Sequence, residues 1–390
     1  MREISIGLLG HGFMGRVHSY AYRAVQHKFR DFGFIPRLYI LAGLEDEQTQ
    51  KASEQYGFEK WTTDWKKLVN DPQVDVVDIC LPEDMHYDVC IEAIKAGKHV
   101  FCEKPLSLDG RRSRLILDAI QGSKIKTMCG FNYRFLPAVR FTKEIIERGF
   151  IGEIYCIRAS YSQESGHDPN RPADQIRYIN GTEPLGAIKG IGSHLLDITR
   201  YLCGEINAVS AIVKTVIPVR PLSGGGIHTV TVDDMAVLNV KMENGAIGSL
   251  IATAMAPGRK NHLTFEINAS KGSIVFDLEN LNNLSVYLAD GPINLRGFSK
   301  INVTGSDHPF TAGWWPPAHI LGWESGHINQ LCHFLNCICK DQNIGPLGAT
   351  FEDGYKAALI ADAAIYSSGC GKEILISEEN FVPKGDSTNG

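Results

Sequence analysis

The sequence contains no long apolar run and no excess of positive charge. No stretch among its 390 residues reaches the roughly 18 consecutive apolar residues that a membrane-spanning helix needs. The net charge of −5 gives no reason to expect nucleic acid or an anionic membrane as a partner. Apolar residues make up 44% and charged residues 21%, which is typical of an ordinary globular protein. We therefore expect a globular protein with neither nucleic acid nor a membrane as partner.

The start of the sequence lacks the features of a signal peptide. The segment MREISIGLLG enters an apolar strand at once and has no small-residue cleavage site. Without an export signal, the ten cysteines are expected to be free thiols in a reducing compartment, so we expect a cytoplasmic protein. Cys332, His333, Cys337 and Cys339 are close enough in sequence to suggest a metal site. They lie in an apolar helical pattern, and no second ligand pair has zinc-like spacing, so we predict no metal.

The first 130 residues alternate between apolar segments typical of buried strands and segments with helical periodicity. Strands are expected at 4–9, 38–42, 74–80, 99–102 and 126–131. Helices are expected at 14–25, 46–56, 85–96 and 110–121. Such alternation predicts a parallel sheet with helices on both faces.

From residue 153 onward, alternating apolar segments typical of strands dominate the sequence. The pair Asn244–Gly245 separates two of them and predicts a hairpin. Helices are expected at 135–149, 186–203, 323–340 and 351–368. We therefore predict an α/β fold with a parallel-sheet domain at 1–130, a domain with a large open, mostly antiparallel sheet at 131–377, and a polar tail at 378–390.

One face of the second sheet is expected to lie against helices, and the other face needs a different cover. We assign apolar residues to this second face, namely Val237, Leu238, Val240, Leu250 and Ile251. Packing of this face against a second sheet predicts a homodimer or homotetramer.

A glycine motif follows the first expected strand. Gly10, Gly12 and Gly15 fit the pattern G-x-G-x-x-G, directly after an apolar strand and at the start of a helical pattern. In a dinucleotide-binding turn the first glycine makes the tight turn, the second admits the diphosphate, and the third lets helix and strand pack closely. The helix N-terminus then offers N–H groups to the phosphates. The alternative is a purely structural turn between strand and helix.

The end of the second expected strand indicates which dinucleotide binds. An acidic residue there hydrogen-bonds the ribose hydroxyls of NAD, whereas an arginine accommodates the extra phosphate of NADP. This sequence has Glu45 and Asp46 and no basic residue, which favours NAD over NADP. The alternative is that both carboxylates only charge the first turn of a helix.

The segment AGKHVFCEKP places Lys104 directly after an expected strand. Ligands of parallel sheets bind outside the carboxyl ends of the strands, and Pro105 keeps Lys104 out of helical geometry. A partly desolvated lysine beside a cationic nicotinamide should have a lowered pKa, which suits a base that removes a hydroxyl proton. The alternative is an ordinary surface lysine.

The chain resembles the glucose–fructose oxidoreductase/inositol dehydrogenase (Gfo/Idh/MocA) family over about residues 4–369. Five motifs in order carry this resemblance: GHGFMG, VDVVDICLPEDMH, AGKHVFCEKPLS, GFNYRFLPAVR with IGEI shortly after, and LGAIKGIGSHLLDITRYLCGEI. The resemblance implies an NAD(P)-binding Rossmann domain followed by a substrate-binding and oligomerisation domain. It also implies oxidation or reduction of a secondary alcohol or ketone on sugars, cyclitols and their derivatives.

The resemblance also implies residue roles: Lys104 would be the catalytic lysine, assisted by His194. The predicted cofactor site comprises Gly10, Gly12, Phe13, Met14, Gly15, Glu45, Leu81, Pro82, His86, Glu103 and Lys104. The predicted substrate site comprises Lys104, Asn132, Arg134, Arg177, Tyr178, Gly190, His194, Trp315 and His319.

His194 and Asp197 are three residues apart and would share one helix face. His194 is a candidate to hydrogen-bond the reacting hydroxyl or relay its proton, and a satisfied core histidine is the alternative. Family members usually carry aspartate four residues before this histidine, where this sequence has Gly190. Lys104 and His194 could suffice, the site could have reduced activity, or a side chain of the loop QESGHDPNRPAD could substitute, namely Glu164, His167, Asp168 or Asp174.

The stretch WWPP followed by GWE is similar to the levoglucosan dehydrogenase-type branch of glycoside and sugar dehydrogenases. Its aromatic residues Trp314, Trp315 and Trp323 could stack on pyranose rings or pack in a core or interface. We predict an NAD-dependent dehydrogenase acting on a secondary hydroxyl of a sugar, glycoside or cyclitol. Redox-neutral glycoside cleavage through a keto-sugar and a non-catalytic, cofactor-dependent sugar sensor are the alternatives.

Overall fold

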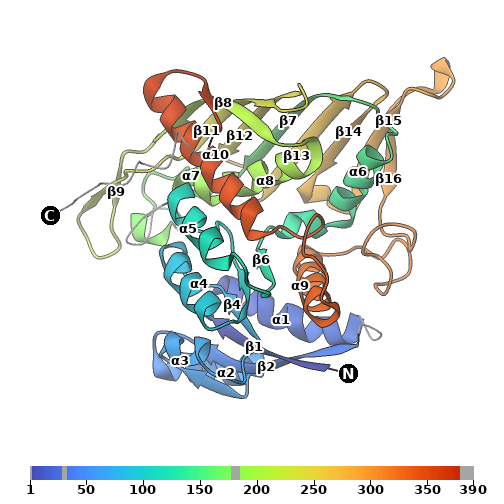
Figure 1. The fold of residues 1–390 in the computed structure, drawn as a ribbon. Helices are drawn as coiled ribbons and strands as arrows, with labels where there is room; N and C mark the ends of the chain where they lie inside the picture. Colours follow the sequence, from blue (N-terminus) through green and yellow to red (C-terminus); the bar gives the residue numbers. More distant parts are fainter. Residues whose placement is uncertain (1, 29–32, 177–184, 378–390) are drawn as a thin grey trace. The chain divides into compact units, whose positions relative to one another are not determined.

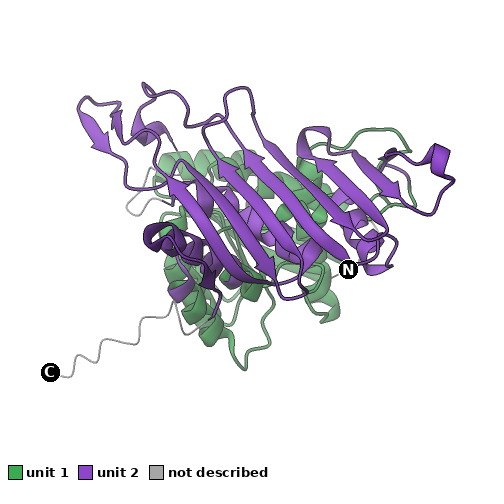
Figure 2. Ribbon diagram, turned by 90° about the horizontal axis from the view of Figure 1, so that it is seen from above, with its two compact units in different colours: residues 1–107, 112–136, 306–355 green, residues 108–111, 137–305, 356–390 purple. Residues whose placement is uncertain are grey.

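The computed structural model describes residues 2–28, 33–176 and 185–377, which form two compact units (Figure 2). Unit 1 comprises Met1–Ser107, Arg112–Leu136 and Ser306–Tyr355. Unit 2 comprises Leu108–Arg111, Pro137–Gly305 and Lys356–Gly390. Every helix among the described residues is too short or too polar to span a bilayer.

Unit 1 is built on a six-stranded parallel sheet with strand order β3-β2-β1-β4-β5-β6 (Figure 1). The strands are β1 (Arg2–Leu9), β2 (Phe34–Ala42), β3 (Lys60–Thr62), β4 (Val76–Ile79), β5 (His99–Cys102) and β6 (Thr127–Cys129). The helices that alternate with them are α1 (Phe13–Lys28), α2 (Asp46–Tyr56), α3 (Trp65–Val69), α4 (His86–Lys95) and α5 (Gly110–Ile120). The parallel sheet expected from the alternation is confirmed. Short, mostly exposed β3 and five-residue α3 were not predicted, because neither has a clear apolar period.

The boundaries of the units differ from the predicted division at residue 131. Helix α9 (Glu324–Lys340) belongs to unit 1, where it packs against α1. Ile328, Leu331 and Phe334 of α9 share one buried core with Ala21 and Tyr22 of α1. The apolar face of α9 therefore completes the core of unit 1, although the helix lies almost 300 residues after α1 in the sequence.

Unit 2 contains a nine-stranded sheet with order β16-β15-β14-β13-β7-β12-β11-β8-β17. The strands are β7 (Ile154–Ser162), β8 (Ile206–Lys214), β11 (Met235–Met242), β12 (Ile247–Thr253), β13 (His262–Ala269), β14 (Gly272–Asp277), β15 (Asn283–Leu288), β16 (Ser299–Asn302) and β17 (Ile374–Leu375). Neighbouring strands are antiparallel except β7 and β12, so the predicted mostly antiparallel sheet is confirmed. The hairpin predicted at Asn244–Gly245 joins β11 to β12. A separate two-stranded sheet pairs β9 (Val219–Pro221) with β10 (Ile227–Thr229).

Helices of unit 2 pack against one face of this sheet (Figure 1). They include α6 (Pro137–Glu147), α7 (Gly186–Gly190) and α8 (Gly192–Cys203), and α10 (Phe351–Cys370) contributes its part beyond Tyr355. The single helix predicted at 186–203 is interrupted at Ile191, where α7 ends before α8 begins.

The assignment of residues to the two sheet faces was wrong in part. Leu238, Val240 and Leu250 are 0–2% exposed, because they share the alternating inward face of β11 and β12. Val237 and Ile251 do belong to the opposite face, with Ile251 37% exposed. Strand register aligns them with Ile212 of β8, which is 71% exposed. The row Ile212, Val237 and Ile251 therefore marks the face that the helices do not cover, which is turned toward the viewer in Figure 2.

Candidate functional site

The glycine motif forms the turn between β1 and α1. A Cβ atom at Gly10, whose φ is +92°, would lie 2.5 Å from the carbonyl oxygen of Cys80. A Cβ atom at Gly15 would lie 2.0 Å from the carbonyl oxygen of Gly10, so helix and turn can approach this closely only without a side chain. A Cβ atom at Gly12 would have nothing within 4 Å. Two glycines are thus required by packing, and the third leaves open space in front of the first turn of α1, which fits a dinucleotide diphosphate.

Two predicted cofactor residues lie on exposed surface near this turn and near the end of β2. Phe13, the first residue of α1, is 55% exposed, and its ring stacks on Trp323 with centroids 5.8 Å apart. Glu45 follows β2 and is exposed; its side chain does not cap α2 and instead accepts a hydrogen bond from the Gln48 amide at 2.6 Å. The carboxylate is therefore available at the strand end where a ribose hydroxyl binds in such folds.

His86 joins the segments that follow β4 and β5. The side chain is fully buried, with Nδ1 2.8 Å from the carbonyl oxygen of Pro105 and Nε2 3.1 Å from that of Leu81. Both predicted cofactor residues Leu81 and Pro82 thus belong to a segment that this ring fixes to the Lys104–Pro105 turn. The contacts position the backbone at the carboxyl ends of two neighbouring strands.

Lys104 follows β5 and is half-buried, as the sequence suggested. The preceding residue, Glu103, is 4% exposed, and its carboxylate accepts the backbone N–H of Lys104 at 3.2 Å. The other carboxylate oxygen lies 3.2 Å from Nε2 of His18 in α1. Glu103 was predicted to contact the cofactor, but its carboxylate points into the protein.

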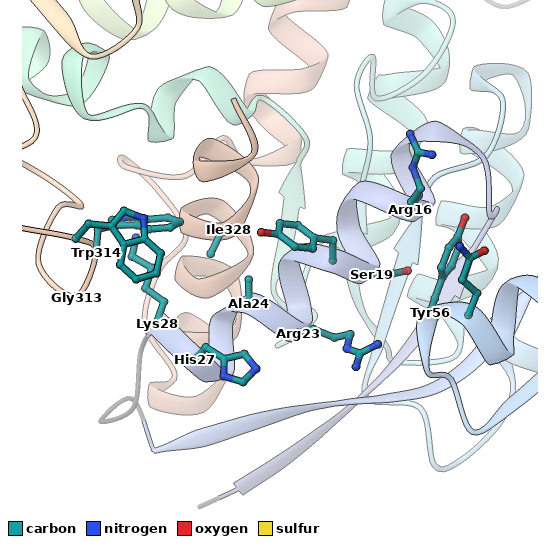
Figure 3. Close-up of a pocket in the computed structure, with 13 residues that line it drawn as sticks. Arg16, Ser19, Arg23, Ala24, His27, Lys28, Tyr56, Gly313, Trp314 and Ile328 are labelled. Carbon is teal, nitrogen blue, oxygen red and sulfur yellow. The ribbon is translucent and has the colours of Figure 1, made fainter. Parts of the chain in front are cut away.

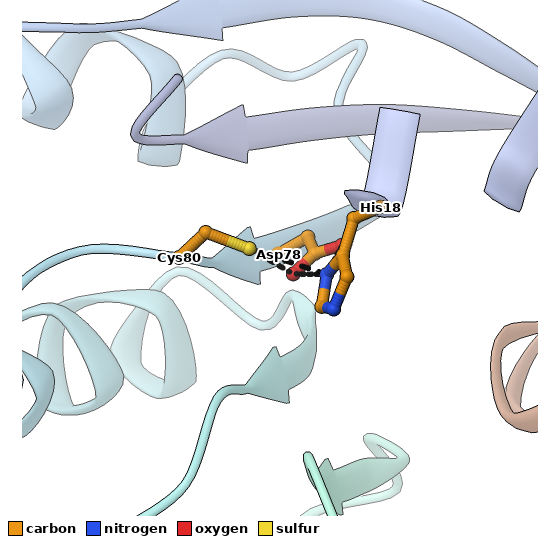
Figure 4. A group of neighbouring side chains, drawn as sticks. All are labelled: His18, Asp78 and Cys80. Carbon is orange, nitrogen blue, oxygen red and sulfur yellow. Dashed lines mark hydrogen bonds and ion pairs between the residues drawn. The ribbon is translucent and has the colours of Figure 1, made fainter. Parts of the chain in front are cut away.

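A buried polar cluster, the His18 cluster, surrounds this contact, and Figure 4 shows three of its members, His18, Asp78 and Cys80. We define it as His18, Tyr22, Asp78, Cys80, Glu103 and His327. Both carboxylate oxygens of Asp78 lie within 3.0 Å of His18 Nδ1, and one of them also accepts the Tyr22 hydroxyl at 2.9 Å. Burial disfavours the imidazolium, but the charge of Asp78 outweighs it and raises the pKa of His18 well above its ordinary value.

The remaining ionisable groups of the cluster respond to His18. Burial opposes ionisation of Glu103, but the adjacent positive charge of His18 outweighs burial and holds the pKa of Glu103 at about 2. Burial and the neighbouring His18 lower the pKa of His327 to about 3. The cluster therefore contains one imidazolium between two carboxylates, with His327 neutral.

Geometry alone would allow a metal ion at three groups of described residues: His18–Asp78–Cys80, His18–Glu103–His327 and His262–Asp277–Glu279. None of these groups contains Cys332, His333, Cys337 or Cys339. In the first group the ligand atoms already pair with one another, because His18 and Asp78 form an ion pair at 2.9 Å. All ten cysteines are free thiols, as expected.

Asn132 and Arg134 lie in a short 3₁₀ turn after β6, and both are buried. The Nδ2 atom of Asn132 has no hydrogen-bond partner among the described residues. Arg134 forms an ion pair with Asp353 at 3.1 Å within unit 1. Asn132 therefore has an unused donor, whereas Arg134 already has a carboxylate partner.

The three tryptophans have different surroundings. Trp314 donates to Asn329 at 3.2 Å and lies 3.6 Å below the ammonium of Lys28, and Trp323 packs against His327 with ring centroids 4.4 Å apart. Both pack within unit 1. Trp315 is 61% exposed, and His319 is exposed with its Nδ1 2.9 Å from the carbonyl oxygen of Pro316.

Trp315 lines a cavity of about 570 Å³ on the outer side of α1 (Figure 3). The lining combines basic and aromatic side chains, among them Arg16, Arg23, Tyr56 and Trp314. Lys104 does not line this cavity. The structure thus places Trp315 among side chains of α1 and α2.

In unit 2, His194 lies in the first turn of α8, and Gly190 ends α7. The ring of His194 is 7% exposed and meets Tyr161 edge-on with centroids 5.9 Å apart. Lys189, beside Gly190, pairs with Asp362 at 2.6 Å and donates to the carbonyl oxygen of Leu108 at 2.8 Å. Arg177 and Tyr178 lie outside the described residues.

The four possible substitutes for a missing acid all have local partners. Glu164 pairs with Lys260 and accepts the Gly258 N–H at 2.8 Å. Asp168 and Asp174 accept backbone N–H groups of Asn170 and Ser223, each at 2.9 Å. His167 Nδ1 lies 2.8 Å from the carbonyl oxygen of Glu164. These contacts bind the four side chains to neighbouring residues of unit 2.

Sequence reasoning did not identify the His18 cluster. The available signal was Asp78, a charged residue within the apolar run VVDIC, since a carboxylate in a buried strand needs a partner.

Comparison with known proteins agrees with the geometry of both units. The family model described as the oxidoreductase family, NAD-binding Rossmann fold, matches residues 4–131, and the GFO/IDH/MocA C-terminal domain matches residues 139–275. The levoglucosan dehydrogenase of Pseudarthrobacter phenanthrenivorans is 38% identical over 94% of this chain and 97% of its own length. The inositol 2-dehydrogenase of Rhizobium meliloti is 28% identical over 96% of this chain and 99% of its own length.

Solved structures agree as well. A levoglucosan dehydrogenase in complex with NADH and levoglucosan has a TM-score of 0.92 at 38% identity, covering 96% of this chain and 100% of that chain. An oxidoreductase domain protein from Kribbella flavida has a TM-score of 0.90 at 35% identity, covering 97% of this chain and 100% of that one. The parallel sheet of unit 1 is an NAD-binding Rossmann domain, and the chain belongs to the GFO/IDH/MocA family of oxidoreductases.

Proposed function

We propose that the protein oxidises a secondary hydroxyl group of a sugar, glycoside or cyclitol. The observation that carries this proposal is the pairing, within one parallel sheet, of an open glycine turn after β1 with a half-buried lysine after β5. Ligands of such sheets bind at the carboxyl ends of the strands. Two relatives are named levoglucosan dehydrogenase and inositol 2-dehydrogenase, which supports this substrate class.

NAD, when bound, supplies the acceptor for the hydride that leaves the substrate carbon. Backbone N–H groups at the start of α1, together with the space in front of Gly12, hold the diphosphate. Glu45 accepts hydrogen bonds from ribose hydroxyls. Lys104 accepts the proton of the reacting hydroxyl, and His194 donates a hydrogen bond to its oxygen.

Other side chains bind the remaining hydroxyls of the substrate. The unused Nδ2 donor of Asn132 suits this role. Arg134, Arg177, Tyr178 and His319 complete the proposed set of substrate contacts, whereas Trp315 lines the cavity beside α1, which Lys104 does not line. For Arg134 the ion pair with Asp353 argues equally for a purely structural role.

A single-turnover experiment tests the function. Protein saturated with NAD is mixed with levoglucosan, myo-inositol or glucose, and NADH absorbance is followed in the wild type and in Lys104→Met. We expect NADH with at least one of these compounds and a rate about 10²–10⁴-fold lower in the variant. Absence of NADH with every compound, while NAD still binds, would contradict the proposal. In a parallel assay with an aryl glucoside, release of the aglycone without NADH would instead identify redox-neutral cleavage.

We further propose a homodimer or homotetramer formed through the uncovered sheet face of unit 2. The apolar row Ile212, Val237 and Ile251 supports it, because contiguous exposed apolar side chains indicate an interface. A cytoplasmic location is consistent with ten free thiols.

A further inference from the structure

His18 lies between two carboxylates that come from different strands. Its Nδ1 is 2.9 Å from Oδ2 of Asp78 in β4, and its Nε2 is 3.2 Å from Oε1 of Glu103, directly after β5. All three side chains are buried, with exposures of 0%, 0% and 4%. Only an imidazolium has an N–H on both ring nitrogens; toward Glu103 the contact is an ion pair, since neither Nε2 nor Oε1 has a hydrogen-bond partner among the described residues.

The other polar groups of the His18 cluster do not supply a competing cation. Tyr22 donates its hydroxyl to Asp78, and burial, reinforced by that carboxylate, raises the pKa of the phenol well above its ordinary value. Burial likewise raises the pKa of the Cys80 thiol. The ring of His327 lies 5.6 Å from that of His18 and is neutral. Within the cluster, the positive charge that balances Glu103 is therefore on His18.

Glu103 connects this charge to the turn that carries Lys104. One carboxylate oxygen faces His18, and the other accepts the backbone N–H of Lys104 at 3.2 Å. Loss of the cation would leave Lys104 as the remaining positive charge that acts on the buried Glu103 carboxylate. Such a carboxylate stabilises a nearby ammonium or moves toward it, and both changes oppose deprotonation of the lysine.

We propose that His18 is a positioning residue for Lys104: its ion pair with Glu103 holds that carboxylate in place, which fixes the Lys104 backbone and limits the pull of the carboxylate on the Lys104 ammonium. This role rests on the proposed function of Lys104 as the base. It assigns a chemical task to a fully buried residue of α1.

The first measurement does not require turnover. Wild type, His18→Asn and His18→Gln, each saturated with NAD, are labelled with trace acetic anhydride across a pH series, and the acetylation of Lys104 is read by mass spectrometry. Asparagine can replace Nδ1 toward Asp78 but cannot reach Glu103, whereas glutamine can replace Nε2. We expect the midpoint of Lys104 labelling to rise by at least about half a pH unit in His18→Asn, because the carboxylate loses its cation.

The second measurement is the pH profile of kcat for NADH formation. We expect His18→Asn to reduce kcat at pH 7 by about tenfold or more, with the acidic limb moved to higher pH and the KM for NAD within about threefold of wild type. His18→Gln should recover part of the loss. Tyr22→Phe is the matched control, because it removes a hydrogen bond to Asp78 without touching Glu103, and it should leave both profiles in place.

The outcomes separate this inference from the proposed function. An unchanged labelling midpoint and an unshifted kcat profile in His18→Asn, with only the melting temperature lowered, would show that His18 merely stabilises unit 1. A wild type that forms no NADH with any compound would refute the proposed function, and the labelling midpoint would still decide the role of His18. A midpoint that shifts equally in Tyr22→Phe would also overturn the proposal, since the effect would then not depend on Glu103.

Discussion

A Cβ atom at Gly15 would stand 2.0 Å from the carbonyl oxygen of Gly10. Helix α1 can therefore begin directly against the end of β1 only because this position has no side chain. Gly12, two residues after Gly10, would place its Cβ in open space. The same turn thus contains two glycines that packing requires, Gly10 and Gly15, and one, Gly12, at which a side chain would meet only open space.

These two glycines should respond differently to substitution. We expect Gly15→Ala to lower the free energy of unfolding by about 3 kcal/mol or more, because backbone atoms must move apart. Gly12→Val should keep the stability of the wild type within about 1 kcal/mol but weaken NAD binding about tenfold or more, since the side chain fills the space for the diphosphate. Urea denaturation and NAD titration measure the two effects. A Gly12→Val variant that binds NAD as tightly as wild type would refute the diphosphate assignment.

The family resemblance predicts an aspartate at the position where this chain has Gly190. We expect Gly190→Asp to raise turnover by about tenfold or more, the low side of what a positioned acid–base group supplies. Gly190→Asn is the control, because it adds similar bulk without a titrating group and should give no gain. Steady-state NADH formation is the measurement. Equal rates in wild type and Gly190→Asp would mean that the site is complete without this carboxylate.

Asp233 should make the stability of unit 2 depend on pH. Its side chain accepts the Ile188 N–H at 2.8 Å, and burial raises its pKa from 3.8 to about 6. A carboxyl with a raised folded-state pKa adds stability that is present below pH 3.8 and is lost as the pH rises through 6. The free energy of unfolding of Asp233→Asn, taken relative to that of the wild type, should therefore rise by up to about 3 kcal/mol between pH 4 and pH 7.5. Denaturation at both pH values measures this, and a constant difference would contradict the raised pKa.

Ile251 tests the proposed interface. A lysine at this 37% exposed position would place a charge in the apolar row of the uncovered sheet face. We expect Ile251→Lys to convert the oligomer to a species near the 43.0 kDa mass of one chain in light scattering after size exclusion. Ile293→Lys is the control, because Ile293 is 81% exposed and lies outside the sheet. A wild type that already elutes as a monomer would refute the interface.

Regular periodicity made most of the fold predictable from the sequence. Helix α2 begins and ends at the predicted residues because Asp46 follows an extended Glu45 and Gly57 adopts the left-handed conformation that ends the helix. The Asn–Gly pair between β11 and β12 was equally informative, since these residues favour the turn that a short hairpin needs.

Features that depend on long-range packing were not predictable. The pattern of β11 shows which residues alternate but not which face meets the helices, so Leu238 was assigned to the wrong face. His18 and Asp78 are 60 residues apart, and no local pattern pairs a helix residue with a strand residue at that separation. The substrate residues remain predictions, because their roles depend on ligands.

Helix α9 closes the core of unit 1 with residues that are synthesised late. Until the chain has been made as far as Lys340, Ala21 and Tyr22 of α1 lack the apolar side chains of α9 that cover them. A nascent chain released by a premature stop in unit 2 would expose that face of α1 to water. The dinucleotide-binding unit is therefore translated first, but its apolar core is complete only after α9 has been made. Unit 1 consequently cannot finish folding before most of the chain has been synthesised.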